Sequence, residues 1–347
     1  MNDREQHLRN KITIISFACS ILVIYIHANN LTTYGIDAKA VGFSRAVYVI
    51  QTYWANVTRI AVPMFFLISG FLLFRTFEPS KMLDKWKTRA FSILLPYIIW
   101  CTIYYIYFIL CTNIPVLSNL VGSTTPVPIS LAEWLRWLWV DEYYTLWFLK
   151  SLIIYIALTP LIWLLLKNHL SKVPTGLIIL LVIIILKNQL QLNSELLADI
   201  EEYLIGSYIG INLSSWTYYK NKKLSIISLI YIAIMALTAF AYWNTVTEIL
   251  LFLAIWFVLD LITIPSDKAL PWWMSITFFT YVAHDIPLEA LEKVIFILGG
   301  STSPMALLDY IFAPLIIEVV LIFIAYILIR LTPKLWSLLS GGRDVHI

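Results

Sequence analysis

The chain has 347 residues, of which 60% are hydrophobic and only 13% are charged, and its formal net charge is +3. Soluble domains carry about 25% charged residues, so this composition predicts an integral membrane protein. The small net charge gives no reason to expect a nucleic-acid partner. The three cysteines lie in or at the ends of apolar runs and include no CxxC pair, so we expect core residues, with no disulfide and no metal site.

The apolar runs predict an all-α fold, an integral membrane bundle of about ten transmembrane helices in a single domain over residues 1–347. A span needs about 20 residues, and the predicted spans are residues 12–28, 47–74, 90–112, 144–166, 174–188, 196–213, 225–243, 246–264, 272–297 and 307–330. The first run has no small-x-small cleavage site, so we interpret it as a span and not as a signal peptide. Most of the 24 Lys and Arg residues fall in alternate connecting segments, which predicts that both termini are cytoplasmic.

The longest predicted outer loop, residues 112–143, contains the aromatic stretch Trp134-Leu-Arg-Trp-Leu-Trp139. Tryptophans favour the headgroup region, so this stretch predicts an amphipathic helix lying on the outer membrane surface. A lip of a substrate-binding site is the alternative interpretation.

The second predicted span combines a charge with an apolar helix. Arg59 precedes the run Ala61–Phe74, and a charge at bilayer depth costs between about 2.5 and 17 kcal/mol. Arg59 must therefore face something other than lipid. Helical spacing places Arg59, Pro63, Phe66 and Gly70 on one face. We expect this face to make the polar contacts of the helix, with the membrane histidines as its partners.

Two of the five histidines lie within predicted spans. His27 ends the first span, and His284 lies near the middle of the ninth. Small residues share the face of His27, which indicates that it points into the bundle. Either histidine could simply hydrogen-bond a neighbouring helix. Lys150 lies with Trp147 near the outer end of the fourth span, where a lysine can also reach the interface.

These residue types are compatible with two classes of function. A neutral histidine can act as general base toward a hydroxyl, and a buried arginine can stabilise the oxyanion of acyl transfer. The basic segment 75–89 could hold the phosphates of a nucleotide-containing donor, or it could serve topology alone. The alternative class is a proton-coupled carrier with His27 and His284 as a proton relay, although the chain shows no matching halves.

Six stretches of the sequence are similar to a known family: Ile21–His27, Arg59–Gly70, Leu94–Trp100, Leu146–Lys150, Phe278–His284, and Pro333–Lys334 followed by Gly341–Arg343. The chain resembles, over nearly its whole length, the acyltransferase 3 family of multi-pass bacterial membrane proteins. Many members O-acetylate cell-surface or lipid-linked carbohydrates, and the family has ten spans.

The resemblance implies an O-acyltransferase of the inner (plasma) membrane, embedded in membrane lipid. Its donor substrate would be a cytoplasmic acyl-CoA, usually acetyl-CoA, with no permanently bound cofactor. The acceptor would be a hydroxyl of a surface or lipid-linked carbohydrate at the outer face. The resemblance also makes His27 the catalytic histidine, either as general base or as a transient acyl carrier. We expect Arg59 to stabilise charge and His284 to complete the site.

The remaining expected site residues divide between donor and acceptor. By the resemblance, the segment with Phe65, Phe66, Ser69 and Gly70 lines the donor path, and we add the basic residues that flank the following loop. The predicted donor-binding residues are Phe65, Phe66, Ser69, Gly70, Arg75 and Arg89. On the acceptor side we expect Lys150 and Trp147. The oligomeric state and the identity of the acyl group and acceptor stay open.

One position departs from the family pattern. Members commonly carry an arginine or lysine eleven residues before the first-helix histidine, on the same face and about 16 Å away along the helix. This sequence has Ser16 there. Either another cation, Arg9, Lys11 or Arg59, replaces it, or the donor is bound differently. Many members also carry an extracytoplasmic hydrolase-like domain, which this sequence lacks, so we expect the chain to act alone or with a separate partner.

Overall fold

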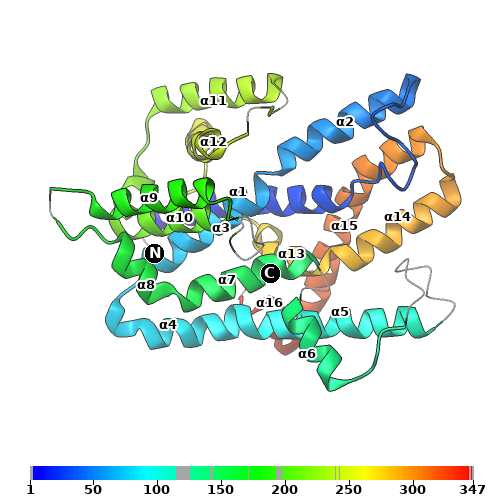
Figure 1. Ribbon diagram of the computed structural model, residues 1–347, viewed down its shortest axis with the longest axis horizontal. Helices are drawn as coiled ribbons and strands as arrows, with labels where there is room; N and C mark the ends of the chain where they lie inside the picture. Colours follow the sequence, from blue (N-terminus) through cyan, green and yellow to red (C-terminus); the bar gives the residue numbers. More distant parts are fainter. Residues whose placement is uncertain are drawn as a thin grey trace.

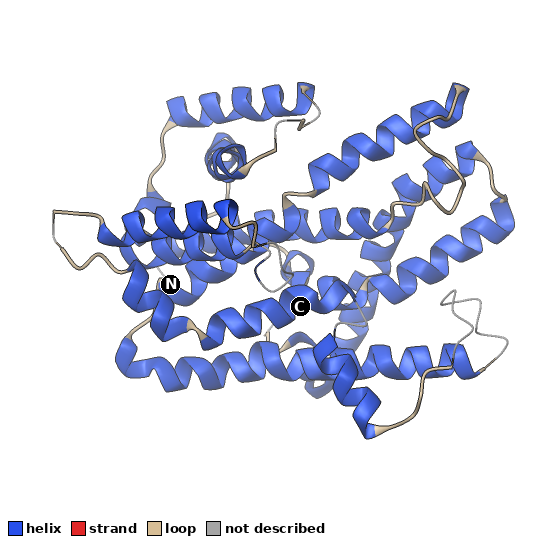
Figure 2. Cartoon of the chain, viewed as in Figure 1, coloured by secondary structure: helices blue, strands red, loops and turns tan. Residues whose placement is uncertain are grey.

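In the computed structural model the described residues are 3–114, 126–140, 144–170, 172–192, 197, 199–238, 240–241, 243–343 and 345. Their regular structure is helical (Figures 1 and 2), apart from an isolated bridge between Leu170 and Val173. The α-helices are α1 (Asp3–His27), α2 (Gly42–Thr58), α3 (Ala61–Phe74), α4 (Met82–Arg89), α5 (Leu95–Asn113), α6 (Leu131–Val140), α7 (Trp147–Ala157), α8 (Thr159–Leu166), α9 (Thr175–Gln189), α10 (Ile200–Asn212), α11 (Lys222–Leu237), α12 (Thr245–Val258), α13 (Thr277–Ala283), α14 (Asp285–Gly299), α15 (Ser303–Leu331) and α16 (Pro333–Ser340). The π-helix η2 (Ala90–Leu94) joins α4 to α5, and short 3₁₀ turns occupy Pro79–Lys81, Tyr144–Leu146, Ser214–Tyr218, Leu259–Leu261 and Trp272–Ser275.

The helical class and the membrane character are confirmed. Four helical segments are long and apolar enough to cross a membrane, and the bent pair α7–α8 makes a fifth candidate; the four are Asp3–His27, Gly42–Phe74, Pro79–Asn113 and Ser303–Leu331. Each predicted span coincides with at least one helix, but a count of ten crossings and cytoplasmic termini stay predictions. The predicted aromatic helix exists as α6. Outside the described residues lie residues 115–125 and 141–143 of that loop and residues 196, 198, 239 and 242 of the predicted spans.

Prolines determine where two of the predicted spans are interrupted. Pro63 has no N–H to donate to the Arg59 carbonyl four residues earlier, and α2 ends and α3 begins at a turn over residues 59–60, whose backbone keeps right-handed helical dihedral angles. Pro287 likewise cannot donate to the Ala283 carbonyl, and α13 ends there. His284 therefore lies at a helix junction and not, as predicted, within a continuous span.

A third proline bends the fourth predicted span. The axes of α7 and α8 differ by 66°, because Pro160 leaves the carbonyl of Ile156 without its helical donor. The Thr159 hydroxyl (2.5 Å) and the Trp86 indole N–H (3.0 Å) donate to that carbonyl instead. The bend thus attaches α4 to α7.

Helix α1 runs through the middle of the bundle and packs against α2, α3, α13 and α15 (Figure 1). Glycines bring α3 and α10 into close contact on another side of α3. A Cβ atom at Gly70 would lie 2.2 Å from the Tyr203 carbonyl oxygen, and one at Gly206 would lie 1.9 Å from the Leu67 carbonyl oxygen. Small residues at such a crossing let two membrane helices approach backbone to backbone, so α10 holds α3 in place beside α1.

We expect Gly206→Ala to destabilise the protein by about 1–3 kcal/mol, because the added methyl group must push α10 away from α3. Thermal unfolding of the detergent-solubilised protein, followed by circular dichroism, measures this. The control is Ile227→Ala on α11, where the side chain is 59% exposed. An unchanged midpoint for Gly206→Ala would contradict the close contact.

Candidate functional site

The structure brings the two span histidines together. His27 closes α1, His284 lies at the junction of α13 and α14, and their ring centroids are 5.0 Å apart with planes inclined at 42°. His284 is completely buried, whereas His27 is only partly so. The chain thus forms a pair with one inner and one more accessible imidazole.

Hydrogen bonds define the tautomer of His284. Its Nδ1 lies 2.8 Å from the Tyr281 carbonyl oxygen and 3.2 Å from the Thr280 carbonyl oxygen. Carbonyl oxygens only accept, so Nδ1 carries the proton and, in the neutral ring, Nε2 keeps its lone pair. That Nε2 atom is buried and has no hydrogen-bond partner among the described residues. A neutral imidazole in this state can accept a proton or a hydrogen bond.

Asp285 adds a carboxylate to the histidine pair. One ligand atom from each of His27, His284 and Asp285 lies within 4.8 Å of the others, and Asp285 is buried. Three such ligands with an open fourth position are the ligand set of catalytic zinc sites. The three side chains could therefore hold a divalent cation, and the expectation of no metal stays a prediction.

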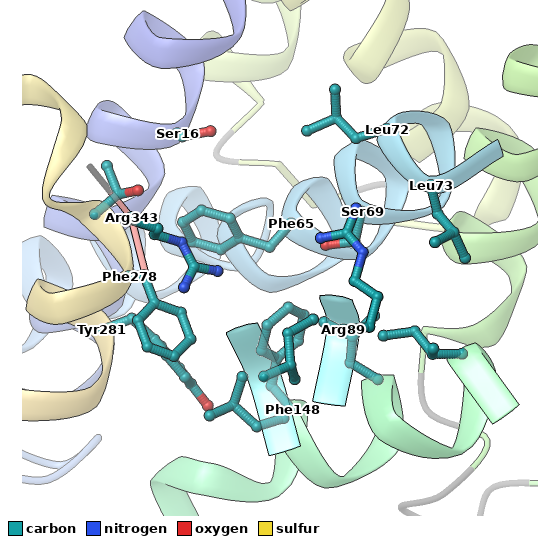
Figure 3. A pocket seen from close by; sticks show the side chains of 15 residues that line it. Ser16, Phe65, Ser69, Leu72, Leu73, Arg89, Phe148, Phe278, Tyr281 and Arg343 are labelled. Atoms are coloured by element: carbon teal, nitrogen blue, oxygen red, sulfur yellow. The ribbon is translucent and has the colours of Figure 1, made fainter. Parts of the chain in front are cut away.

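A cavity of about 160 Å³ lies between α1, α3, α7 and α13 (Figure 3). Most of its lining is apolar; the lining residues are Ser16, Phe65, Ser69, Leu72, Leu73, Arg89, Ile93, Phe148, Leu149, Leu152, Ile156, Thr277, Phe278, Tyr281 and Arg343. Tyr281 links this wall to the histidine pair, because its carbonyl accepts the hydrogen bond from His284.

Two arginines give the cavity a positive charge. Arg89 comes from the end of α4 and Arg343 from the segment after α16, and in Figure 3 they extend inward from two sides, with Phe65 between them. Among the described residues that line this cavity, none is acidic. Both arginines also line a second, more polar cavity of about 420 Å³, whose other lining residues are Lys81, Asp84, Lys85, Thr88, Ser92, Gly341 and Gly342. Arg89 and Arg343 therefore lie at the boundary between a basic cavity and an apolar one.

Three of the six predicted donor-binding residues, Phe65, Ser69 and Arg89, line the apolar cavity. The other three lie elsewhere. Phe66 is buried in an aromatic cluster, with its ring centroid 4.5 Å from that of Phe148, and Gly70 packs against α10. The cavity side of α3 thus runs through residues 65, 69 and 72, and the predicted functional face with Pro63, Phe66 and Gly70 packs inside the bundle.

Arg75 and Arg59 also occupy positions other than those expected. Arg75 forms an ion pair with Glu5 (Nη2–Oε2, 2.7 Å) and donates to the Tyr218 hydroxyl at 3.0 Å, which joins α3 to the start of α1. Arg59 is exposed, and its guanidinium lies 5.7 Å from the centroid of the Trp243 ring. Neither residue lines either cavity.

On the predicted acceptor side, the Lys150 ammonium group donates to the Trp139 carbonyl oxygen at 3.1 Å. This hydrogen bond holds α6 to α7. Trp147 packs on Phe66, with ring centroids 5.9 Å apart. The structure thus gives both residues contacts within the bundle, and their role toward an acceptor stays a prediction.

None of the three cations that could replace the missing charge at Ser16 lines the cavity that contains Ser16. Lys11 is buried in an ion pair with Asp260 at 2.8 Å, and Arg9 pairs with Glu5 at the surface. The cations that the structure does place there are Arg89, one of the predicted donor-binding residues, and Arg343. The sequence offers a signal for Arg343, the Gly-Gly-Arg motif near the C-terminus, but the motif does not show where the tail returns.

Comparisons with curated proteins and with solved structures gave no match. The model of a family described as an acyltransferase domain matches residues 13–332 of the 347. The match contains both histidines and Arg89 but ends before Arg343. Nearly the whole chain is covered, and the protein therefore belongs to the acyltransferase 3 family of membrane acyltransferases.

Proposed function

We propose that the protein is an O-acyltransferase of the inner membrane that moves an acyl group, in the first instance acetyl, from cytoplasmic acyl-CoA to a hydroxyl of a cell-surface or lipid-linked carbohydrate. The observation that carries this proposal is the His27–His284 pair, which Tyr281 connects to an apolar cavity whose boundary holds two arginines. Family membership favours an enzyme over a proton-coupled carrier. Ten spans with both termini in the cytoplasm complete the proposal.

The two cavities suit the two parts of an acyl-CoA. Its nucleotide part carries phosphates, which arginine and lysine bind through charge-assisted hydrogen bonds. The basic cavity with Lys81 and Lys85 offers such groups. The pantetheine arm is narrow and mostly uncharged, and it would extend past Phe65 and Phe148 through the apolar cavity toward Tyr281.

The chemistry requires one proton transfer and one acyl transfer. The acceptor oxygen attacks the thioester carbonyl carbon, while His27 takes the hydroxyl proton as general base. The carbon–sulfur bond then breaks, and His27 returns the proton to the departing thiolate of coenzyme A. The Nε2 atom of His284 keeps its lone pair. It can therefore accept a hydrogen bond from the protonated His27 ring during this step.

Removal of the general base tests the enzyme class. We expect His27→Ala to lower acyl transfer by about 10²–10⁴-fold, measured as label passing from radiolabelled acetyl-CoA into extractable glycan or glycolipid in membranes. His169→Ala is the matched control, because His169 is exposed and lies outside both cavities. A His27→Ala protein that inserts normally and transfers label at the wild-type rate would refute the proposed role.

Chelation tests the alternative use of the histidine pair. If the pair acts through free imidazoles, transfer in membranes treated with EDTA continues at the untreated rate. A rate that falls after EDTA and recovers when Zn²⁺ is added would instead assign His27, His284 and Asp285 to a metal ion.

Arg89 tests donor binding. We expect Arg89→Gln to raise the KM for acetyl-CoA roughly tenfold to a hundredfold, the effect of losing a hydrogen bond to a charged group, with a smaller change in kcat. Lys87→Gln is the control, since Lys87 is exposed on the same helix and lines neither cavity. Equal changes in KM for both variants would mean that general charge attraction, and not the cavity, binds the donor.

A further inference from the structure

Residues 341–343, which follow α16, lie against the protein. Helix α16 packs against α5 and α13. The Trp100 indole N–H donates to the Leu339 carbonyl oxygen at 3.0 Å, and the Trp336 indole N–H donates to the Arg343 carbonyl oxygen at 3.1 Å. These bonds fix the backbone on both sides of the turn that leads to Arg343.

Two glycines form that turn. Gly341 and Gly342 have φ angles of +69° and +68°, a region that residues with a side chain rarely adopt. A Cβ atom at Gly341 would lie 2.3 Å from the Ser92 carbonyl oxygen, and one at Gly342 would lie 2.7 Å from the Phe91 ring. The turn therefore presses the tail directly onto the π-helix η2, and only glycine fits at both positions.

Two backbone carbonyls and an aromatic ring hold the Arg343 guanidinium in place. Its Nη1 donates to the carbonyl oxygens of Ser92 (3.2 Å) and Ser340 (2.5 Å), and its central carbon lies 3.9 Å from the centroid of the Phe278 ring. Pro96, four residues later, has no N–H to donate to the Ser92 carbonyl, and a carbonyl oxygen has two lone pairs with which to accept.

The charge of Arg343 is not balanced by a described carboxylate. Among the described residues no ion pair involves Arg343 or Arg89. Burial, together with the nearby charge of Arg89, lowers the pKa of Arg343. A guanidinium has five N–H donors, and the carbonyl bonds use only Nη1, so donors stay available for an anion in the cavity.

Ser16 lies in the wall of the same cavity. It is the position on α1, eleven residues before His27, at which this chain has a hydroxyl where a cation was expected. The cavity that lacks a charge from α1 thus contains one from the tail, whose Arg343 contacts Ser92 of η2 and Phe278 of α13.

We propose that Arg343 is the cation that α1 lacks at Ser16, and that Arg343 and Arg89 together bind a phosphate group of the donor, so that the C-terminal tail is a wall of the donor site. This inference rests on the proposed acyl-CoA donor. It goes beyond the family match, which ends at residue 332.

Binding measurements on the full-length detergent-solubilised protein test it without any acceptor. The two probes are coenzyme A and pantetheine, which lacks every phosphate, both measured by competition with radiolabelled coenzyme A. We expect Arg343→Ala to raise the Kd of coenzyme A at least about tenfold. Competition by pantetheine is measured with the wild type and with Arg343→Ala, each at a concentration of radiolabelled coenzyme A equal to that protein's own Kd. The inhibition constant of pantetheine should be the same for both proteins. Lys334→Ala is the control, because Lys334 is an exposed cation of α16, the helix that precedes the tail.

Two further variants separate position from folding. Gly341→Ala keeps the arginine but displaces the turn, and it should weaken coenzyme A binding as Arg343→Ala does. Ser16→Arg combined with Arg343→Ala places the charge on α1 and should restore most of the coenzyme A affinity. Restoration supports the exchange of one cation for the other, whereas its absence overturns it.

Other outcomes decide the inference in either direction. Equal loss of coenzyme A and pantetheine binding would show a structural role for the tail and overturn the phosphate contact, as would an unchanged Kd for coenzyme A in Arg343→Ala. A protein that binds coenzyme A through Arg343 but transfers no acyl group would refute the proposed function alone. A protein that transfers label, but whose affinity for coenzyme A is the same with and without Arg343, would refute this inference alone.

Discussion

The need to satisfy backbone carbonyls in an apolar environment shapes this structure. An unsatisfied carbonyl costs free energy, and in lipid no water can replace the missing donor. Each proline inside an apolar run removes one donor. Pro160 leaves the Ile156 carbonyl to Thr159 and Trp86, and Pro96 cannot serve the Ser92 carbonyl, which accepts from Arg343.

The same constraint positions the histidine pair. Pro287 ends the helix near Ala283, and His284 occupies the junction with its Nδ1–H directed at backbone carbonyls of its own helix. Its Nε2 atom is consequently left facing the interior beside His27. The interruption of the helix, not a separate loop, places a defined tautomer beside His27.

The sequence predicted the helical class and the membrane character, because long apolar runs report these features locally. Of the predicted site residues, His27 and His284 lie together, and Phe65, Ser69 and Arg89 line the cavity, while their functional roles stay predictions. These residues share one property, since each can be recognised from its own helix.

The errors have a different origin. Pro63, Phe66 and Gly70 share one face of α3, but that face packs inside the bundle, and the cavity side of α3 lies one residue away. Arg75 is engaged by Glu5, which is distant in sequence, and the return of the tail to Ser92 depends on contacts between opposite ends of the chain. Spacing within one helix carries no information on such pairings.

The position of Arg343 after α15 and α16 has a consequence for biogenesis. Ribosomes make the chain from its N-terminus, so every helix that lines the apolar cavity is synthesised before the second arginine exists. The tail can dock only when α5 and α13 already lie side by side with α16. A nascent or truncated chain could therefore assemble the membrane bundle and still lack Arg343, one of the two positive charges of the apolar cavity. Arg343 takes its position late, after the helices around it have packed correctly.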